Sequence, residues 1–332
     1  MHRVAVLGAG SWGTALAIHL ARGGHDVRLW VREPELVEAM RERRENTMFL
    51  PGFTLPANLR PCGAYDEALA GAHLVVCAVP SHGTRSVLRE AAPFVEPDAI
   101  VISATKGLEV HTRQRISEVI AEEFGAARPV VVLSGPSFAV EVARQLPTAV
   151  CAASRDLQAA ALVQTEFRAR YFRIYVTDDV VGVEIGAALK NVIAIAAGAV
   201  EGLGLGHNSL AALVTRGLAE ISRLAGAVGG RRETLAGLSG LGDLVLTCTG
   251  DLSRNRFVGM ELGKGRKLAD ILAGMTEVAE GVRTARSAHA LGQKLDVAMP
   301  ITDMVYRVLY DDLPAQRAVA ELMTRDLKHE LE

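Results

Sequence analysis

The segment RVAVLGAGSWGTALAIHLARGGHDVRLWVRE, residues 3–33, carries the pattern that decides the fold. A short apolar run leads into Gly8-Ala9-Gly10-Ser11-Trp12-Gly13, a helix-like stretch follows, and a second apolar run begins at Val27. Glycines at this spacing permit a tight turn and close approach of a pyrophosphate, and the helix N-terminus offers unpaired N–H groups to an anion. A glycine-rich turn alone is weak evidence, but strand, loop, helix and second strand stand here in the order of a dinucleotide-binding unit.

The end of the second apolar run bears on which dinucleotide is bound. Arg32 stands where a cation would meet a 2′-phosphate, whereas Glu33 is an acid of the kind that favours NAD. The alternative interpretation is a pair of solvated surface charges. The sequence leaves NAD and NADP both open and favours NADP, or the use of both, over strict NAD.

The first half of the chain alternates apolar runs with helix-like segments, which predicts right-handed βαβ units and a parallel sheet. The runs are apolar almost throughout, as strands covered on both faces are. We expect strands at Val4–Leu7, Val27–Val31, Leu74–Val79, Ile100–Ser103 and Val130–Leu133, with further strands at Thr148–Ala152 and Phe172–Val176. We expect helices at Ser11–Arg22, Glu35–Arg44, Thr84–Phe94 and Arg113–Phe124.

The strand pattern stops after about Asp178. Helices are expected at Val180–Glu201, Ser209–Ala225, Arg231–Leu238, Arg254–Leu262, Lys267–Ala273, Arg283–Leu295, Ile301–Tyr310 and Pro314–Leu322. The predicted fold class is therefore α/β, with an N-terminal Rossmann-type, mostly parallel sheet and a C-terminal all-α domain. We place the first domain at residues 1–178 and a substrate-binding, catalytic domain at 179–332.

The composition narrows the classes of partner. With 36 basic and 38 acidic side chains the net charge is −2, so nothing attracts nucleic acid or anionic lipid in bulk, although a small phosphorylated ligand needs only a local basic site. Four scattered cysteines form no C-x-x-C pair, so we expect no disulfide framework, which fits a reducing cytoplasm. An apolar run begins almost at the first residue, so we expect no signal peptide. Lys190 and Asn191 interrupt the apolar stretch 185–200, which we interpret as a buried helix rather than a membrane span.

Lys190 is the most unusual residue in the chain. Its neighbours on a helix are all small or apolar: Gly186, Ala187, Ile193, Ala194 and Ala197. No acid stands three or four residues away to pair with it. Such a lysine either extends out of a core helix toward water or is held in a pocket by a distant partner, where desolvation would lower its pKa and suit it to acid–base chemistry.

Two further groups follow expected strands, at the sheet edge where open α/β folds bind ligands. Lys106 follows the run 100–103, and Gly135 and Ser137 follow the run 130–133. The alternative for Ser137 is a helix N-cap.

The last group lies in the expected helical domain. Asp243 is either a helix cap or turn residue, or a partner for Lys190. Ser253 is expected to cap a helix whose first turn holds Arg254 and Asn255. A cation at a positive helix end makes sense where an anion such as phosphate binds, and otherwise it is surface charge.

Taken together, these segments resemble the bacterial NAD(P)-dependent glycerol-3-phosphate dehydrogenases. The matching segments run in order along nearly the whole chain: VLGAGSWGTALA at 6–17, VPSH at 79–82, ATKGLE at 104–109, LSGPSFAVE at 133–141, ALKNVIAIAAG at 188–198, TRGLAE at 215–220, GLGDLVLTCT at 240–249, SRNR at 253–256 and MPI at 299–301.

The resemblance implies reversible reduction of dihydroxyacetone phosphate to sn-glycerol 3-phosphate with NADPH or NADH, which feeds phospholipid synthesis, with Lys190 as the acid–base residue and a homodimer as the assembly. It implies substrate contacts from Lys106, Gly135, Ser137, Lys190, Asp243, Ser253, Arg254 and Asn255. It implies cofactor contacts from Ser11, Trp12, Arg32, Lys106, Ala139, Arg254, Val278 and Glu280, beside Gly8, Gly10 and Gly13 of the loop. No metal is implied.

The sequence leaves two other functions open. One is a related hydroxyacid or ketoacid reductase with the same two-domain plan, against which the expected phosphate site at Ser253–Asn255 argues. The other is a non-catalytic NAD(P)H-sensing or scaffold protein, which would need the glycine loop but not Lys106, Lys190 and Asp243 together. We assign no role to His207 and Asn208.

Overall fold

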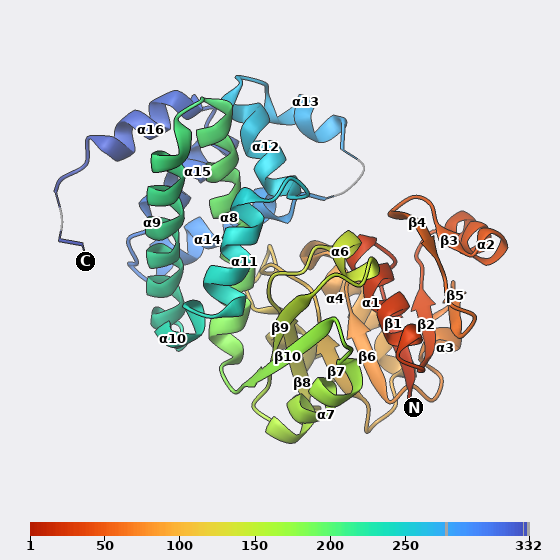
Figure 1. The fold of residues 1–332 in the computed structure, drawn as a ribbon. Helices are drawn as coiled ribbons and strands as arrows, with labels where there is room; N and C mark the ends of the chain where they lie inside the picture. Colours follow the sequence, from red (N-terminus) through yellow and green to blue (C-terminus); the bar gives the residue numbers. More distant parts are fainter. Residues whose placement is uncertain (276–277, 328, 331–332) are drawn as a thin grey trace.

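The computed structural model describes residues 1–275, 278–327 and 329–330, and Figure 1 shows a sheet with its helices in the N-terminal half and a cluster of helices in the C-terminal half. The sheet has the strand order β10-β9-β8-β7-β6-β1-β2-β5. Its strands are β1 (Arg3–Leu7), β2 (Asp26–Trp30), β5 (Leu59–Cys62), β6 (Leu74–Cys77), β7 (Ile100–Ser103), β8 (Val130–Ser134), β9 (Thr148–Ala153) and β10 (Phe172–Thr177). Neighbouring strands are parallel except β8 and β9. The predicted mostly parallel Rossmann-type sheet is confirmed.

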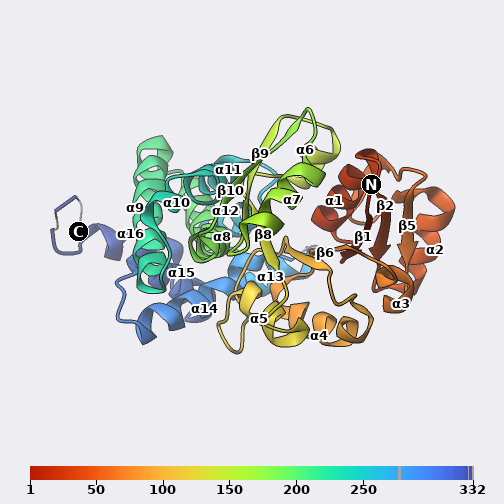
Figure 2. The same cartoon turned by 90° about the horizontal axis from the view of Figure 1, so that it is seen from below.

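Strand β1 explains why the runs are apolar throughout. Val4 and Val6 point into a core shared with α1, while Ala5 and Leu7 point into a second core on the opposite face, and all four are fully buried. Helices cover both faces (Figure 2). They are α1 (Ser11–Arg22), α2 (Pro34–Arg43), α6 (Ala139–Ala143) and α7 (Leu157–Phe167) against the first core, and α3 (Tyr65–Leu69), α4 (Ser81–Ala91) and α5 (Ile116–Phe124) against the second, with a 3-10 turn at Ala92–Phe94.

The helical half is organised around α8 (Val180–Gly202). Around it lie α9 (Gly206–Ala227), α10 (Arg232–Leu235), α11 (Asp243–Thr249), α12 (Arg254–Gly263), α13 (Leu268–Ala273), α14 (Glu280–Lys294), α15 (Pro300–Tyr310) and α16 (Ala315–Met323). By length and composition α8 would be able to cross a membrane, but 83% of its most apolar window is buried inside the fold. It is therefore the core helix of this half, as its sequence predicts.

Several local predictions were wrong or incomplete. The helix expected from Arg113 begins only at Ile116, because Arg113 has a left-handed backbone and the Glu118 carboxylate accepts from the backbone N–H of Arg115, the residue before the helix. The helix expected at 231–238 ends at Leu235, and a π turn occupies Leu238–Gly242. Elements that the sequence analysis did not anticipate are α3, α6, α7, α11, strand β5 and the hairpin of β3 (Glu45–Asn46) and β4 (Leu50–Thr54).

Helices α8 and α12 cross with almost no space between their backbones. A Cβ on Gly259 would lie 1.8 Å from the carbonyl oxygen of Ile195, and one on Gly198 would lie 1.9 Å from that of Arg256. Only glycine fits at these two positions, and this contact holds the N-terminus of α12 close to the middle of α8.

We expect Gly259→Ala to lower the free energy of unfolding by at least about 1–3 kcal/mol, because the added methyl group must push two backbones apart. Gly226→Ala is the control: it lies on α9 with open space around its Cβ position, so alanine there should be neutral or stabilising by about 0.5–1 kcal/mol. Urea denaturation of both variants measures the difference. Equal effects would contradict the close crossing.

Candidate active site

Lys106 lies where the parallel sheet meets the helical half. It follows β7, and its ammonium donates to the carbonyl oxygen of Gly135 at 3.1 Å, to the hydroxyl of Ser137 at 3.5 Å and to a carboxylate oxygen of Asp243 at 2.9 Å. Gly135 and Ser137 follow β8, the parallel neighbour of β7. The predicted sheet-edge residues are therefore brought together, and Asp243 reaches them from the helical half.

Lys190 occupies the middle of α8 and is 5% exposed. Its ammonium donates to the other carboxylate oxygen of Asp243 at 2.5 Å and to the Thr247 hydroxyl at 2.9 Å. That hydroxyl donates to the backbone carbonyl of Asp243 at 2.6 Å, so it is free to accept from the lysine. Lys190 is thus held in a pocket by a distant partner, one of the two alternatives that its sequence environment left open.

Burial sets the acid–base character of Lys190. Desolvation lowers the pKa of its ammonium from 10.5 to about 7; the carboxylate of Asp243 opposes this shift and the nearby charge of Lys106 adds to it. A buried lysine that titrates near neutral pH exchanges a proton readily under physiological conditions.

Asp243 is the link between the two lysines. It is 1% exposed and begins α11 directly after the π turn, and its side chain makes no capping hydrogen bond there. The cap interpretation is wrong, and the alternative, a partner for Lys190, is what the geometry gives. Thr247, one turn further along α11, was missed because a threonine inside an apolar run carries no signal by itself.

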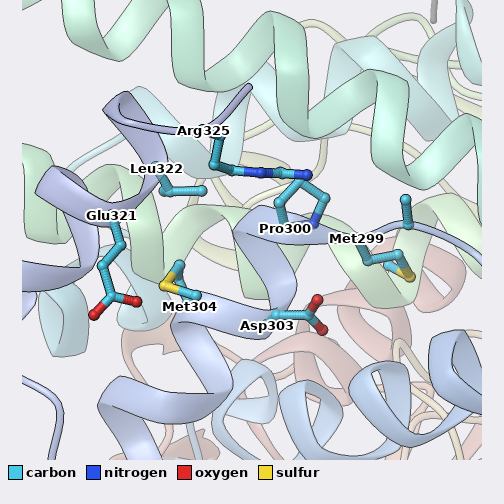
Figure 3. A pocket seen from close by; sticks show the side chains of 8 residues that line it. Met299, Pro300, Asp303, Met304, Glu321, Leu322 and Arg325 are labelled. Atoms are coloured by element: carbon cyan, nitrogen blue, oxygen red, sulfur yellow. The ribbon is translucent and has the colours of Figure 1, made fainter. Parts of the chain in front are cut away.

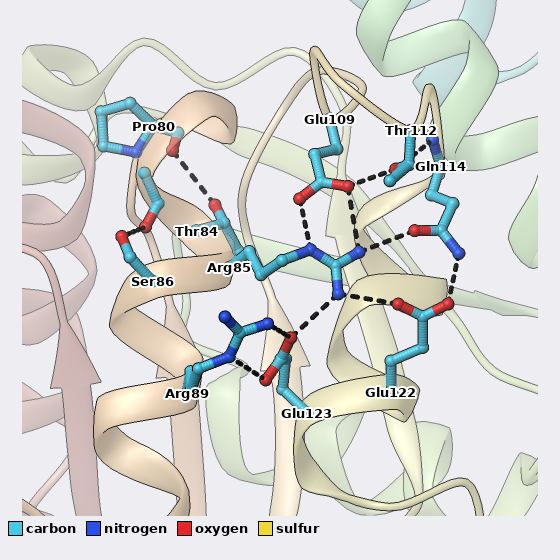
Figure 4. Close-up of polar contacts among 11 residues, drawn as sticks. Pro80, Thr84, Arg85, Ser86, Arg89, Glu109, Thr112, Gln114, Glu122 and Glu123 are labelled. Atoms are coloured by element: carbon cyan, nitrogen blue, oxygen red, sulfur yellow. Dashed lines mark hydrogen bonds and ion pairs between the residues drawn. The ribbon is translucent and has the colours of Figure 1, made fainter.

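A polar network on α4 and α5 holds the loop that follows Lys106 (Figure 4). Arg85 of α4 donates to both carboxylate oxygens of Glu109, at 2.5 and 3.0 Å, and also to Glu122, Glu123 and Gln114. Glu109 is buried, and hydrogen bonding to Arg85 lowers the pKa of its carboxyl. The loop is therefore fixed three residues beyond Lys106.

Asn255 connects the residue beside Lys190 on α8 with the start of α14. Its amide nitrogen donates to the side-chain oxygen of Asn191 at 3.0 Å, and its amide oxygen accepts from the backbone N–H of Gly281 at 2.8 Å. Asn191 adjoins Lys190 on α8. Ser253 caps α12 by accepting from the N–H of Arg256, as predicted, and Arg254 is exposed in the first turn.

Glu280, beside Gly281 at the start of α14, ties the helical half to α4. Its carboxylate accepts from the hydroxyl of Ser81 at 2.6 Å and from the Ser81 N–H at 3.2 Å. Gly107, next to Lys106, has a left-handed φ of 146°, and a Cβ there would lie 2.8 Å from the Ser81 hydroxyl. Burial raises the pKa of the Glu280 carboxyl. Val278, just ahead of α14, is half-buried.

The glycine loop has the shape that a dinucleotide requires. A Cβ on Gly8 would lie 2.9 Å from the carbonyl oxygen of Ala78, and one on Gly13 would lie 1.9 Å from that of Gly8, so both positions pack too tightly for a side chain. At Gly10 a Cβ would meet nothing within 4 Å, and α1 begins there without a side-chain cap. Open space in front of uncapped N–H groups fits a pyrophosphate.

Three further predicted cofactor residues lie on elements of the N-terminal half: Trp12 in the first turn of α1, Arg32 after β2 and Ala139 at the start of α6. The indole nitrogen of the half-buried Trp12 is buried without a hydrogen-bond partner. Arg32 is 78% exposed and donates twice to one carboxylate oxygen of Glu33, at 2.9 and 2.6 Å. Ala139 begins α6, whose first turn also lacks a side-chain cap. Ser137 does not cap that helix, because Phe138 occupies the N-cap position, and the Ser137 hydroxyl donates instead to the carbonyl oxygen of Gly135.

A surface cavity of about 330 Å³ lies between α15 and α16, and Figure 3 shows its lining side chains. It contains none of the predicted site residues. His207 and Asn208 are exposed in the first turn of α9 and also lie outside the group of contacts described above.

A glycine-rich loop on a parallel sheet, together with a buried lysine of the helical half that shares one carboxylate with a lysine at the sheet edge, defines the class of two-domain NAD(P)-dependent dehydrogenases. Two family models match the chain: the N-terminal part of NAD-dependent glycerol-3-phosphate dehydrogenase at residues 3–160 and its C-terminal part at 179–320. The chain belongs to this family.

Individual relatives agree with the family. The chain is 57% identical over 330 residues, 99% of its length and 98% of the relative's, to a glycerol-3-phosphate dehydrogenase [NAD(P)+] of Geobacter metallireducens. The crystal structure of glycerol-3-phosphate dehydrogenase from Coxiella burnetii has a TM-score of 0.95 at 42% identity and covers 98% of this chain and 99% of its own. A ketopantoate reductase from Ralstonia eutropha, with a TM-score of 0.60 at 16% identity, covers 96% of this chain and 99% of its own and shares the fold alone.

The lowered pKa of Lys190 has a consequence for stability. Between pH 7 and 10.5 the unfolded chain holds a proton at this position that the native chain has lost, so the wild-type free energy of unfolding rises with pH in this range. Lys190→Met removes that rise. The stability of this variant relative to wild type should therefore be greatest below pH 7 and decline toward pH 10, as urea denaturation at several pH values will measure. A difference that does not vary with pH would contradict the lowered pKa.

Proposed function

We propose that this chain interconverts dihydroxyacetone phosphate and sn-glycerol 3-phosphate with NADPH or NADH, and that Lys190 is its general acid and base. The observation that carries the proposal is the sharing of one buried carboxylate, that of Asp243, by two lysines from the two halves of the chain. Membership of the family supplies the reaction, and this arrangement supplies the residues that would perform it.

The charges in the site suit a proton donor to a ketone oxygen. Lys106 and Asp243 form an ion pair in which the two charges balance, so Lys190 is the group left to gain or lose a proton near neutral pH. In the reducing direction the ammonium of Lys190 would give its proton to the C2 oxygen, and in the oxidising direction the neutral amine would take it back. Thr247 and Asp243 would hold the Lys190 amine in place through both states.

The bound nicotinamide, when reduced, supplies the hydride for C2. Gly8, Gly10, Ser11, Trp12 and Gly13 would hold the pyrophosphate side of the dinucleotide. Arg32 would meet a 2′-phosphate in competition with Glu33, which is why we propose that both NADPH and NADH are accepted. The remaining proposed cofactor contacts are Lys106, Ala139, Arg254, Val278 and Glu280.

The substrate would be held from both halves. We propose Lys106, Gly135 and Ser137 for the glycerol end, together with Asp243, and Ser253, Arg254 and Asn255 at the N-terminus of α12 for the phosphate. A ten-residue helix presents N–H groups and a partial positive charge at that end, to which Arg254 adds a full one.

The wider biological assignments rest on the family. We propose a division into domains at residue 178, between β10 and α8, and a homodimer as the assembly. We further propose that the enzyme works in the cytoplasm without a nucleic-acid partner, and that its product supplies the glycerol backbone of phospholipids.

The role of Lys190 is tested by Lys190→Met. Without its proton donor, turnover of dihydroxyacetone phosphate should fall by at least about 10²–10⁴-fold, while the Kd for NADPH stays within threefold. Lys267→Met, at an exposed lysine ahead of α13, is the control and should leave both unchanged. Normal turnover by Lys190→Met would remove this residue from its role. Good turnover of ketopantoate by the wild type, with none of dihydroxyacetone phosphate, would instead favour the ketoacid reductase hypothesis.

The pH dependence of the two directions tests the charge arrangement. Because the protonated Lys190 is needed for reduction and the neutral amine for oxidation, kcat/KM for reduction should fall as pH rises through about 7, and kcat/KM for oxidation should rise. Lys106→Met removes a neighbouring positive charge, so both midpoints should move to higher pH even though the overall rates drop. Initial rates from pH 5 to 10 give the midpoints. A midpoint that stays in place would show that Lys106 does not act on Lys190.

A further inference from the structure

The glycine loop, which we propose binds the cofactor, accepts a buried hydrogen bond from a residue far from it in the sequence. Asn46, on β3 of the short hairpin, is completely buried, and its amide nitrogen donates to the carbonyl oxygen of Ala9 at 2.8 Å and to the hydroxyl of Thr14 at 2.9 Å. The Thr14 hydroxyl also reaches the Ala9 carbonyl, at 3.2 Å. A side-chain amide nitrogen carries two hydrogens, so these two bonds use its whole donor capacity on the loop and the first turn of α1.

The hairpin itself does not depend on these two bonds. The amide oxygen of Asn46 accepts from the N–H of Phe49 at 3.1 Å and so shapes the turn. Arg44 donates to the carbonyl oxygens of Leu55 and Leu59 at 2.9 and 3.3 Å. Leu50 of β4 is 1% exposed in the core that also receives α1. The amide oxygen of Asn46 therefore binds within the hairpin, and its amide nitrogen binds the glycine loop and α1.

The geometry of the peptide bond shows how the hydrogen bonds from the Asn46 amide nitrogen affect the loop. In a planar trans peptide the C=O and the following N–H point in opposite directions. Because Asn46 and Thr14 bind the Ala9 carbonyl, the N–H of Gly10 points to the opposite side of this peptide, away from these two side chains. Glycine tolerates a reversed φ, so nothing in the Ala9–Gly10 segment alone prevents this peptide from flipping and turning the N–H away.

We propose that Asn46 is a positioning residue for dinucleotide binding: its buried amide nitrogen locks the Ala9–Gly10 peptide in the orientation that presents the Gly10 N–H to the pyrophosphate. This inference rests on the dinucleotide dependence of the proposed function and is independent of which ketone is reduced. Asn46 would touch neither the cofactor nor the substrate.

The test compares variants that remove the donor with variants that keep it. Asn46→Asp keeps an oxygen for the Phe49 N–H and loses both bonds to the loop; its Kd for NADPH should rise about 10–100-fold. With dihydroxyacetone phosphate at saturating NADPH, its kcat and KM should stay within threefold of wild type. NADPH binding is followed by the fluorescence of the reduced nicotinamide, without substrate. A wild type that binds NADPH but reduces no dihydroxyacetone phosphate would overturn the proposed substrate and leave this inference standing.

A control and a second pair of variants separate positioning from stability. Leu50→Ala weakens the hairpin without touching the loop and should lower the Tm while leaving the Kd for NADPH near the wild-type value. Thr14→Val removes the hydroxyl and should weaken NADPH binding at least fivefold, whereas Thr14→Ser keeps it and should bind like wild type. If Asn46→Asp does not fold, the Thr14 pair decides. NADPH binding by Asn46→Asp or Thr14→Val that is no weaker than by Leu50→Ala would overturn the proposal.

Discussion

The carboxylate of Asp243, held between the ammonium groups of Lys106 and Lys190, is the interaction on which the rest of the site depends. A buried charge costs several kcal/mol unless a partner and further hydrogen bonds compensate it. Here one carboxylate, 1% exposed, faces two cations, so full compensation requires one lysine to be neutral part of the time. Lys190 is the more deeply buried of the two lysines, so desolvation disfavours its charged form and lowers its pKa to about 7. The lowered pKa of Lys190 therefore follows chiefly from burial, and the positive charge of Lys106 adds to it.

This contact also constrains how the two halves of the chain meet. Lys106 follows a strand of the sheet, whereas Asp243 and Lys190 lie on helices of the C-terminal half, so the pair forms only when the halves pack in one way. Other buried contacts fix the same arrangement. Glu184 of α8 accepts from Arg115 at 2.9 Å and from the Ser117 N–H at 2.8 Å, at the N-terminus of α5. Glu280 accepts from Ser81 at the N-terminus of α4. Each is a carboxylate placed beside N–H groups that the end of a helix leaves unpaired.

The sheet and the long helices were predictable because they repeat a local pattern. Strand β1 is apolar on both faces and α8 is apolar over most of its surface, and both patterns predict elements that are covered on nearly every side. The predictions failed where local signals are short or absent. The five-residue helices α3 and α6 are too brief for a period to show, and the π turn before Asp243 depends on a close approach of Gly240 to the backbone of Leu235. The hairpin that carries Asn46 has one strand of only two residues, and its other strand, Leu50–Thr54, contains a proline and a glycine that weaken the strand pattern.

The sequence by itself determined the dinucleotide loop, the α/β fold class and the candidate lysines, because each depends on residues close together in the chain. It did not determine which partner Lys190 has, since Asp243 is 53 residues away and its sequence environment is equally compatible with a helix cap. Nor did it show what the side chains of Thr247, Asn191 and Asn46 contact, because a threonine or asparagine by itself gives no sign of its partner. Only the tertiary structure decided these pairings. Burial makes an unpaired polar group expensive, so the partners that such groups find are set by packing between distant segments.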